Sequence, residues 1–391
     1  MTHLDLLVVG SGPAGAALAA SMSRSGASVL LVESARHPRP KACAEYASPR
    51  ILEELGRIGI PASEWDDAAV PLSGMHLHAG DRSSVISYAD RRGPRSAWGV
   101  DRRIFDARLA SHATVSGVTL RERTTALRLE TVDGRVRGAW IRDRETGRDE
   151  LVTADWVAGA DGVRSTVARN VGVEQPIRFP RRLGLVAHYS GAHGLGDHGE
   201  MHVGAGGYIG LAPMPGGELS VGMALPLDAA AGSADSQFEA LIAAIPAVAD
   251  RLRGLRRVSP IRGAAPIGHR VSRTAGPGWL LVGDAAGFVD PFTGEGIHRA
   301  LRSARAASDA LSAGGDVARA YMRARRRAFA AKTALTWLVQ GFLAAPPLLV
   351  HAVTMLDRRP AAALRLGSAL GDLRPATDAL TPRALLEVLA P

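Results

Sequence analysis

The sequence predicts an α/β fold with two interleaved domains, followed by a set of C-terminal helices. One domain is expected to contain a parallel β-sheet, because three separated stretches (residues 6–15, 158–165 and 279–296) each join a short apolar run to a glycine-containing turn. The other is expected to contain a mixed β-sheet, because residues 74–88 and 178–225 show short alternating runs with many glycines. The order of these patterns makes the first domain discontinuous.

The first stretch places a phosphate-binding turn directly after a buried strand, residues 6–9. Gly10 allows a tight turn, and Gly12 lets the main chain approach a pyrophosphate. Gly15 lets the following helix, residues 13–25, pack against the strand. The N-terminus of that helix offers free N–H groups and a positive dipole end to phosphates. The residues predicted to bind the cofactor here are Gly10, Gly12, Pro13, Ala14 and Gly15.

An acidic residue completes the dinucleotide pattern. Residues 28–32 form the next apolar run, and Glu33 stands at its end. This position is about 20 residues beyond the glycines, where a carboxylate can accept hydrogen bonds from ribose hydroxyls. Strand, glycines, helix, strand and acid together predict a Rossmann-type unit with a bound dinucleotide.

The second and third stretches each place an acidic residue at the end of a strand. Residues 156–160 read as a strand that emerges at Asp161, and residues 280–282 read as a strand with Asp284 beyond its end. An ordinary Asp-Gly turn explains Asp161 taken alone. In this order and at these distances, however, the three stretches indicate one pocket for FAD.

The third stretch continues into a long helix, predicted at residues 297–311. Gly294 and Gly296 permit close approach of the main chain to a ligand, and Ile297 begins the helix. A helix dipole at this position can stabilise negative charge on reduced flavin. The predicted FAD-binding domain therefore comprises residues 1–70, 95–175 and 270–315, the substrate domain residues 71–94 and 176–269, and the C-terminal helical region residues 316–391.

Composition excludes several classes of protein. The chain has 391 residues, 46% of them hydrophobic, which fits an ordered globular protein with more than one domain. The formal charge is +9, but no basic stripe is interleaved with stacking aromatics, so we predict no nucleic-acid partner. Cys43 is the single cysteine, which excludes a disulfide framework and a cysteine-based metal cluster. No metal is predicted.

A hydrophobic stretch near the C-terminus bears on location. Residues 334–356 are long enough to cross a bilayer, but Gln340, His351 and the pair Pro346-Pro347 interrupt them. We expect two packed helices; the alternative is a peripheral contact with lipid, or a lid over an apolar substrate. With no signal peptide before the first strand, the expected location is cytoplasmic, with membrane association as the alternative.

The three stretches resemble the superfamily of FAD-dependent aromatic hydroxylases, flavin halogenases and geranylgeranyl reductases, over residues 4–310. Two further segments are similar to the geranylgeranyl-reductase-like branch. Residues 41–49, Lys-Ala-Cys-Ala-Glu-Tyr-Ala-Ser-Pro, match its Lys-x-Cys…Ser-Pro segment, and residues 294–297, Gly-Glu-Gly-Ile, also resemble it.

The resemblance implies roles for individual residues. In residues 100–106, Val-Asp-Arg-Arg-Ile-Phe-Asp, it gives Arg102 the task of pairing with the FAD phosphates, with Arg103 as the rival. Asp161 would reach the pyrophosphate region, where hydroxylases also dock NAD(P)H, and Asp284 would bind the ribityl chain. Without a second Rossmann unit, NAD(P)H is expected only as a transient reductant.

Candidate catalytic residues are Cys43, Tyr208 and His298. Cys43 lies in a loop that the related reductases place over the flavin, where a thiol could protonate a substrate carbon. A small buried cysteine is its simpler interpretation. For His298, a histidine that faces the core is the alternative.

The reaction has two main interpretations. Gly210 and Ala212 replace two bulky aromatics of the reductases, which opens space and favours an NAD(P)H-driven monooxygenase that hydroxylates or epoxidises a hydrophobic or aromatic small molecule. The alternative is a flavin-dependent reductase of carbon–carbon double bonds in a prenyl-like or polyketide-like substrate. A non-catalytic flavin-bearing partner is a third class, and halogenation is disfavoured because the Trp-x-Trp-x-Ile-Pro segment is not recognisable.

Overall fold

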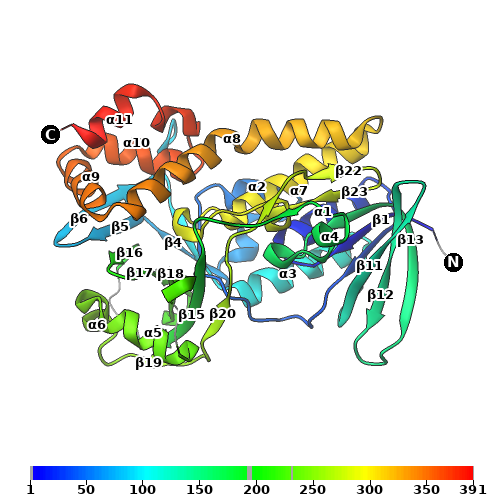
Figure 1. The fold of residues 1–391 in the computed structure, drawn as a ribbon, viewed down its shortest axis with the longest axis horizontal. Helices are drawn as coiled ribbons and strands as arrows, with labels where there is room; N and C mark the ends of the chain where they lie inside the picture. The colour runs from blue at the N-terminus through cyan, green and yellow to red at the C-terminus, as the bar shows by residue number, and fades with distance from the viewer. Residues whose placement is uncertain (1–2, 192–195, 230–231, 391) are drawn as a thin grey trace.

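A computed structural model describes residues 3–191, 196–229 and 232–390. The predicted domain ranges also include residues 1–2, 192–195, 230–231 and 391, which lie outside the described residues. Figure 1 shows strand β1 near one end of the molecule and the C-terminal helices at the other, with the long helix α8 running between them. The structure confirms the predicted α/β class with mixed sheets.

The first large sheet carries the nucleotide-binding pattern. Its central strands are parallel, and β1 lies between β2 and β13 with Val9 opposite Val32 and Gly159. Because both faces of β1 are covered, its apolar run is buried without alternation. The strands are β10 (Thr119–Arg121), β2 (Val29–Val32), β1 (Leu4–Val9), β13 (Asp149–Gly159), β12 (Arg135–Asp143) and β11 (Thr124–Val132), with β23 (Trp279–Leu281) on β13 and β22 (Ala275–Gly276) on β23.

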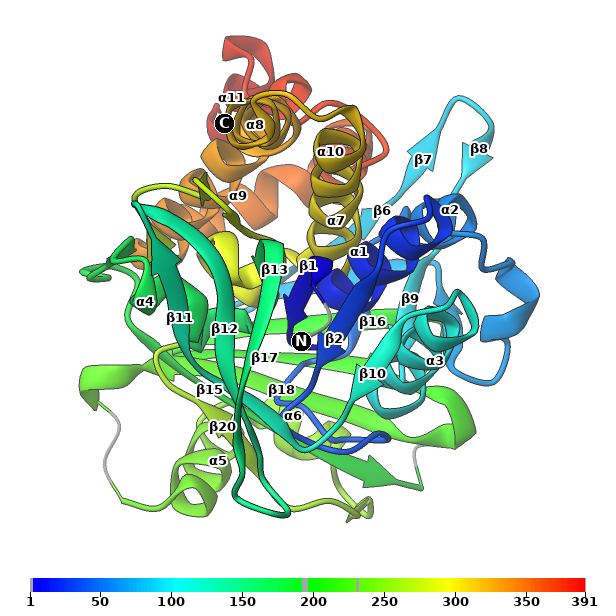
Figure 2. The same ribbon diagram turned by 90° about the vertical axis from the view of Figure 1, so that its right-hand side faces the viewer.

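Helices cover one face of this sheet. Figure 2 shows α1, α3 and α7 on that side, and their apolar residues form one core with Leu6, Val8 and Leu31. On the other face, Leu7 and Val9 pack with residues of β11, β12 and helix α4. The helices are α1 (Pro13–Arg24), α2 (Ile51–Arg57), α3 (Arg102–Val115), α4 (Thr166–Asn170) and α7 (Gly296–Ala313).

The second large sheet is mixed, as the glycine-rich alternating runs predicted. Neighbouring strands are antiparallel except for the parallel pair β16 and β5. In order the strands are β19 (Arg256–Arg257), β15 (Arg182–Ser190), β18 (Leu219–Pro226), β17 (Gly207–Pro213), β16 (His198–Gly204), β5 (Gly74–Ala79) and β6 (Arg82–Ser87), with β20 (Arg262–Ala264) on β15. Helices α5 (Ala234–Ala243) and α6 (Pro246–Arg251) cover its outer face.

The remaining strands are short. A three-stranded sheet has the order β3 (Tyr46–Ala47), β9 (Ala97–Val100) and β4 (Ala69–Leu72). The loop that follows β2 in the chain ends at β3. Two strand pairs stand apart, formed by β14 (Glu174–Gln175) with β21 (Arg270–Val271) and by β7 (Ala89–Asp90) with β8 (Gly93–Pro94).

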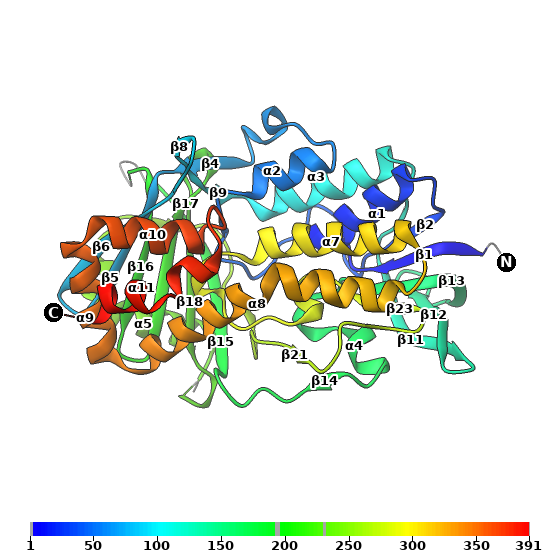
Figure 3. The same cartoon turned by 90° about the horizontal axis from the view of Figure 1, so that it is seen from above.

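The C-terminal region is helical and joins the two large sheets. Helix α8 (Val317–Ala344) runs along α7, and α9 (Pro346–Arg358) packs on the inner face of β5 and β6 (Figure 3). Two shorter helices follow, α10 (Pro360–Leu370) and α11 (Pro382–Leu389).

The apolar stretch at residues 334–356 belongs to two helices, as predicted: α8 ends at Ala344 and α9 begins at Pro346. The axes of α8 and α9 meet at 114°. In the described part of the chain, no helix taken singly has both the length and the apolar character to cross a membrane; only this bent pair meets those criteria, and only jointly.

Candidate functional site

A cavity of about 720 Å³ lies between the two large sheets. The parallel order β2, β1, β13, β23 brings the ends of three strands to one edge, where ligands of open α/β sheets bind. The three stretches singled out in the sequence meet there. Among the lining residues are Gly12, Pro13, Ala14, Asp161, Asp284, Gly294, Gly296 and Ile297.

The glycines of the first turn have different surroundings. Gly10 has a φ of +98°, and a Cβ on Gly15 would lie 1.8 Å from the carbonyl oxygen of Gly10. Both positions therefore require glycine for the turn itself. A Cβ on Gly12 would meet only Arg39, at 3.7 Å. The space beside Gly12 is thus left open at the N-terminus of α1, where a pyrophosphate would lie.

Glu33 is buried at the end of β2 and is tied to the glycine turn. Its Oε2 accepts hydrogen bonds from the main-chain N–H and the hydroxyl of Ser11, both at 3.0 Å. Arg39 lies 3.3 Å from the same oxygen. Burial opposes ionisation, but the charge of Arg39 and these hydrogen bonds hold the pKa of Glu33 below its ordinary value. The sequence analysis missed Ser11 and Arg39; Ser11 lies inside the glycine motif.

Asp161 carries an unpaired polar atom into the cavity wall. Its Oδ2 accepts hydrogen bonds from the main-chain N–H groups of Thr166 and Val167, at 2.6 and 3.4 Å. Its Oδ1 is buried and has no partner among the residues that the structure describes. Burial raises the pKa of Asp161. A hydroxyl group of a ligand would donate a hydrogen bond to this oxygen and satisfy it.

The segment before α7 is anchored by contacts between buried Glu295 and side chains of helix α8. Gly294 has a φ of +65°, and a Cβ on Gly296 would meet no atom within 4 Å. Between them, Glu295 is buried: Lys332 lies 3.5 Å from its Oε2, and Thr336 donates a 3.2 Å hydrogen bond to its Oε1. The sequence analysis missed Lys332, which is visible there only as one of two lysines.

These observations fit a flavin dinucleotide. The space beside Gly12, the unpaired oxygen of Asp161 and the open approach at Gly296 lie along one cavity. Glu33 at the end of β2 would hold the ribose, and Asp284 lines the same cavity.

Arg102 and Arg103 point to different places. Arg102 is buried in the cavity wall and makes a bidentate pair with Asp106, at 2.8 and 2.9 Å. Arg103 pairs instead with Asp101 at 2.7 Å, and its side chain is 45% exposed. Burial alone would lower the pKa of Arg102, but the charge of Asp106 outweighs burial and raises this pKa above its ordinary value. The guanidinium therefore stays cationic. The phosphate role of Arg102 stays a prediction.

Cys43 lies beside Arg102 in the cavity wall. Its Sγ accepts hydrogen bonds from Arg102 Nη1, at 3.2 Å, and from the main-chain N–H of Glu45, at 3.4 Å. Both donors would stabilise negative charge on the sulfur. The thiol is therefore surrounded by polar groups at the cavity, as a reactive cysteine would be.

Glu45 and His188 form a buried pair that the sequence analysis missed. Glu45 has a φ of +59° and lines the cavity, and its carboxylate accepts hydrogen bonds from His188 and from the main-chain N–H of Arg102. Burial lowers the pKa of His188, but the hydrogen bond and charge of Glu45 outweigh this and raise it overall. Glu45 stands two residues after Cys43 in the motif already singled out, whereas His188 has no local signal.

Tyr208 lines the cavity, but its hydroxyl is engaged. It donates a 2.6 Å hydrogen bond to Asp290, and Arg182 pairs with the same carboxylate. Gln340 of α8 accepts a 2.6 Å hydrogen bond from Arg182. Burial and the charge of Asp290 raise the pKa of Tyr208 well above 10. This arrangement favours a positioning role for Tyr208 over proton transfer.

His298 is not among the residues that line the cavity. Its Nδ1 lies 2.9 Å from Asp372; the histidine is buried and the aspartate is partly buried. The structure therefore favours the core histidine over the predicted catalytic one, because helix α7 turns this side chain toward the C-terminal region.

Comparisons with known proteins agree on cofactor and fold. The family described as "FAD binding domain" matches residues 3–314. The menaquinone reductase of Mycolicibacterium smegmatis is 30% identical over 326 residues, which are 80% of this chain and 78% of that protein. The digeranylgeranylglycerophospholipid reductase of Methanosarcina mazei is 31% identical over 329 residues, 79% of this chain and 76% of that protein.

Solved structures share the fold at lower identity. A flavin-dependent brominase superposes with a TM-score of 0.84 at 21% identity, covering 99% of both chains. A geranylgeranyl bacteriochlorophyll reductase-like protein from Thermoplasma acidophilum superposes with a TM-score of 0.79 at 23% identity, covering 96% of this chain and 100% of that one.

Proposed function

This chain belongs to the FAD-binding-domain family, and from that premise we propose that it reduces carbon–carbon double bonds in the isoprenoid chain of a lipid. It is an FAD-dependent oxidoreductase. The observation that carries the proposed reaction is Cys43 in the cavity wall, where Arg102 and the main-chain N–H of Glu45 donate hydrogen bonds to its sulfur. The two relatives compared above are reductases of lipids with isoprenoid chains, which supports the substrate class.

The cavity suits an apolar chain. Its lining includes Met75, Leu185 and Met201 from strands of the second sheet, and Ile267 and Phe288 from connecting segments. A Cβ on Gly210 would lie 3.4 Å from Met201, so this glycine leaves room above the sheet. The space left by the small residues Gly210 and Ala212, which favoured oxygenation in the sequence analysis, is therefore also space for an isoprenoid chain.

The reaction needs a hydride on one alkene carbon and a proton on the other. When bound, FAD would supply the hydride, with NAD(P)H as the proposed external reductant. Cys43 would give its proton to the second carbon, and the sulfur would be left as a thiolate. Arg102 and the Glu45 main-chain N–H would stabilise that thiolate. The buried Glu45–His188 pair holds a further proton at the same wall.

Oxygenation, which the sequence favoured, remains the second candidate. Its support is the absence of bulky side chains at Gly210 and Ala212 on the cavity side of β17. The relatives favour reduction over it. The two reactions differ in a measurable way, because only oxygenation consumes O2 and adds an oxygen atom to the product.

The test is an anaerobic incubation of the purified protein with NAD(P)H and a polyprenyl lipid, followed by mass spectrometry. We expect products that are heavier by two hydrogens for each reduced bond. Cys43→Ala should lose at least about 100-fold in product formation, in the range of general-acid contributions, while reduction of the flavin by NAD(P)H continues. Products that appear only with O2 and carry an added oxygen would overturn the proposal.

A lipid substrate implies contact with a membrane surface. Phe179 and Trp337 are 51% and 44% exposed, and their rings lie 6.5 Å apart between centroids. Exposed Arg178 is next to Phe179 in the chain. We propose that this patch rests on an anionic lipid surface. Sedimentation with anionic vesicles should decrease for Trp337→Ser, and equal sedimentation would contradict the proposal.

A further inference from the structure

A cluster of histidines lies on the outer face of the second sheet, behind the cavity wall. His78 on β5 pairs in register with His202 on β16, and His76 pairs with Glu200. Met201, between Glu200 and His202, faces the other way, and both Met201 and Glu200 are among the residues that line the cavity. Because β5 and β16 are parallel neighbours, all four side chains lie on one face of the sheet.

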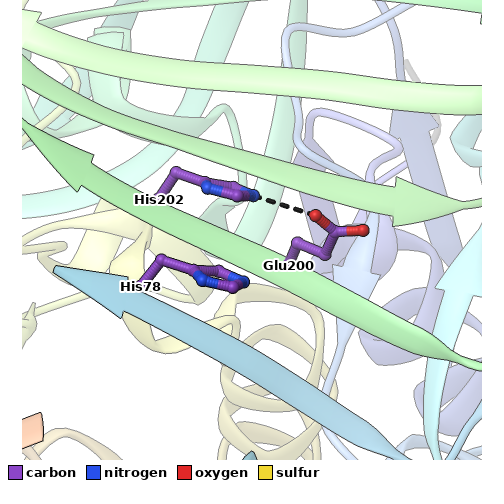
Figure 4. A group of neighbouring side chains, drawn as sticks. All are labelled: His78, Glu200 and His202. Carbon is purple, nitrogen blue, oxygen red and sulfur yellow. Dashed lines mark hydrogen bonds and ion pairs between the residues drawn. The ribbon is translucent and has the colours of Figure 1, made fainter. Parts of the chain in front are cut away.

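Three of these side chains converge on one point. The ligand atoms of His78, Glu200 and His202 lie within 4.8 Å of one another. Figure 4 shows the two imidazole rings side by side with the Glu200 carboxylate next to them. The rings are nearly parallel, with centroids 4.3 Å apart and planes inclined by 7°.

The His202–Glu200 contact is shorter than the distance between two ligand atoms of a zinc site. His202 Nε2 and Glu200 Oε2 are 2.9 Å apart, a hydrogen-bond distance. In a tetrahedral zinc site with bonds of 2.0–2.1 Å, two ligand atoms lie about 3.3 Å apart. An ion would therefore replace this hydrogen bond and separate the two atoms by about 0.4 Å, with His78 as the third ligand.

The three side chains supply ligand types that a zinc-like ion takes. Imidazole nitrogen and carboxylate oxygen both bind such ions. His202 is buried, and His78 and Glu200 are partly buried.

An outer contact fixes the carboxylate. Arg251 at the end of α6 lies 2.7 Å from Glu200 Oε1, the oxygen that does not face His202. This leaves Oε2 for the ion and holds the carboxylate plane, as outer partners of metal ligands do. His76, which is opposite Glu200 on β5, packs against His198, with ring centroids 4.7 Å apart.

We propose that His78, Glu200 and His202 form a binding site for a divalent transition-metal ion of the zinc class. Two imidazoles and one carboxylate would bind it, and water would occupy the remaining position. The ion would join β5, β16 and, through Arg251, helix α6. No metal is predicted from the sequence, because a single cysteine excludes a cysteine cluster and these histidines lie on strands far apart in the chain.

The test uses the whole protein purified without a polyhistidine tag and treated with a chelator. Titration with Co²⁺, followed by visible absorption and calorimetry, should show one ion per chain with tetrahedral absorption bands, displaced by Zn²⁺. His78→Ala and His202→Gln should each lower the Co²⁺ affinity by at least about tenfold, because even outer-shell partners contribute 10- to 100-fold.

His3→Ala is the matched control, because His3 is exposed and pairs with Asp155 outside the cluster. Its affinity for Co²⁺ should equal that of the unaltered chain. His78 is only partly buried, so His78→Ala should retain its melting temperature without metal and keep the result interpretable. No binding by the unaltered chain, or binding by either cluster variant as tight as that of the unaltered chain, would overturn the proposal.

Discussion

The two ends of the cavity are held by different means. At the phosphate end, the shape comes from the main chain: Gly10 and Gly15 bring β1 and α1 close together, and Gly12 leaves the space beside the helix open. At the end formed by residues 290–296, the shape comes from buried charged side chains that belong to distant segments, such as Glu295 with Lys332. The phosphate end therefore depends on local backbone geometry, and the other end depends on long-range electrostatics.

The largest expected effect separates two glycines of the phosphate end. Gly12→Val should give a folded protein without flavin colour, because its side chain would occupy the open phosphate space. Gly15→Val should fail to fold, because its Cβ would collide with the Gly10 carbonyl at 1.8 Å. Absorption of the purified protein and circular dichroism check both. A yellow Gly12→Val protein would show that the phosphate lies elsewhere.

The opposite end should respond through stability. Lys332→Met removes the cation between the buried Glu295 and the partly buried Asp372. Leaving these two carboxylates without it should lower the free energy of unfolding by about 3–5 kcal/mol. Chemical denaturation measures this, with Arg383→Met, an exposed residue of α11, as the control. If both variants lose equally little, the charges do not hold this end.

Replacing Arg102 tests whether its side chain binds the FAD phosphates. Arg102→Ala should weaken FAD binding by about 1.5–3 kcal/mol, the range of a charge-assisted contact. Arg103→Ala should leave it unchanged, because Arg103 faces Asp101 and solvent. Equilibrium titration of the flavin-free variants with FAD measures the difference. Equal affinities would remove Arg102 from the phosphate site.

The smallest effect is a pH dependence from the Glu45–His188 pair. The pKa of His188 is raised above 6.5 in the folded chain. Its stabilising contribution is therefore full below pH 6.5 and is lost as the pH rises through the higher folded value. The difference in unfolding free energy between the unaltered chain and His188→Gln should shrink from pH 6 toward pH 8. A constant difference would show that His188 does not titrate there.

The sequence predicted the phosphate end of the cavity better than the end formed by residues 290–296. The strand, glycine turn, helix and Glu33 were all found, because each depends on neighbours in the chain. The helix predicted at 297–311 is α7, one residue longer at its start and two at its end. The antiparallel strands β11 and β12 and helices α5 and α6 were not identified, since no motif marks them.

Long-range contacts limited the prediction of the site. Asp290 is paired with Arg182, and Glu295 with Lys332, across separations that no local pattern encodes. His298 looked catalytic because it follows the Gly294–Ile297 segment, yet α7 turns it toward Asp372. Residue spacing predicts which backbone approaches a ligand, whereas the direction of a side chain depends on how the helices pack.

Helix α8 has a consequence for how this chain can be divided. The family similarity ends at residue 314, before α8 begins at Val317. Yet Gln340 contacts Arg182, the partner of Asp290, and Lys332 lies against Glu295. Both anchor points of the loop next to the proposed flavin thus depend on a segment outside the matched region. A chimera that exchanges everything after residue 314 with a relative must therefore exchange residues 290–295 and Arg182 as well, since recombination at that border would separate Lys332 from Glu295 and Gln340 from Arg182.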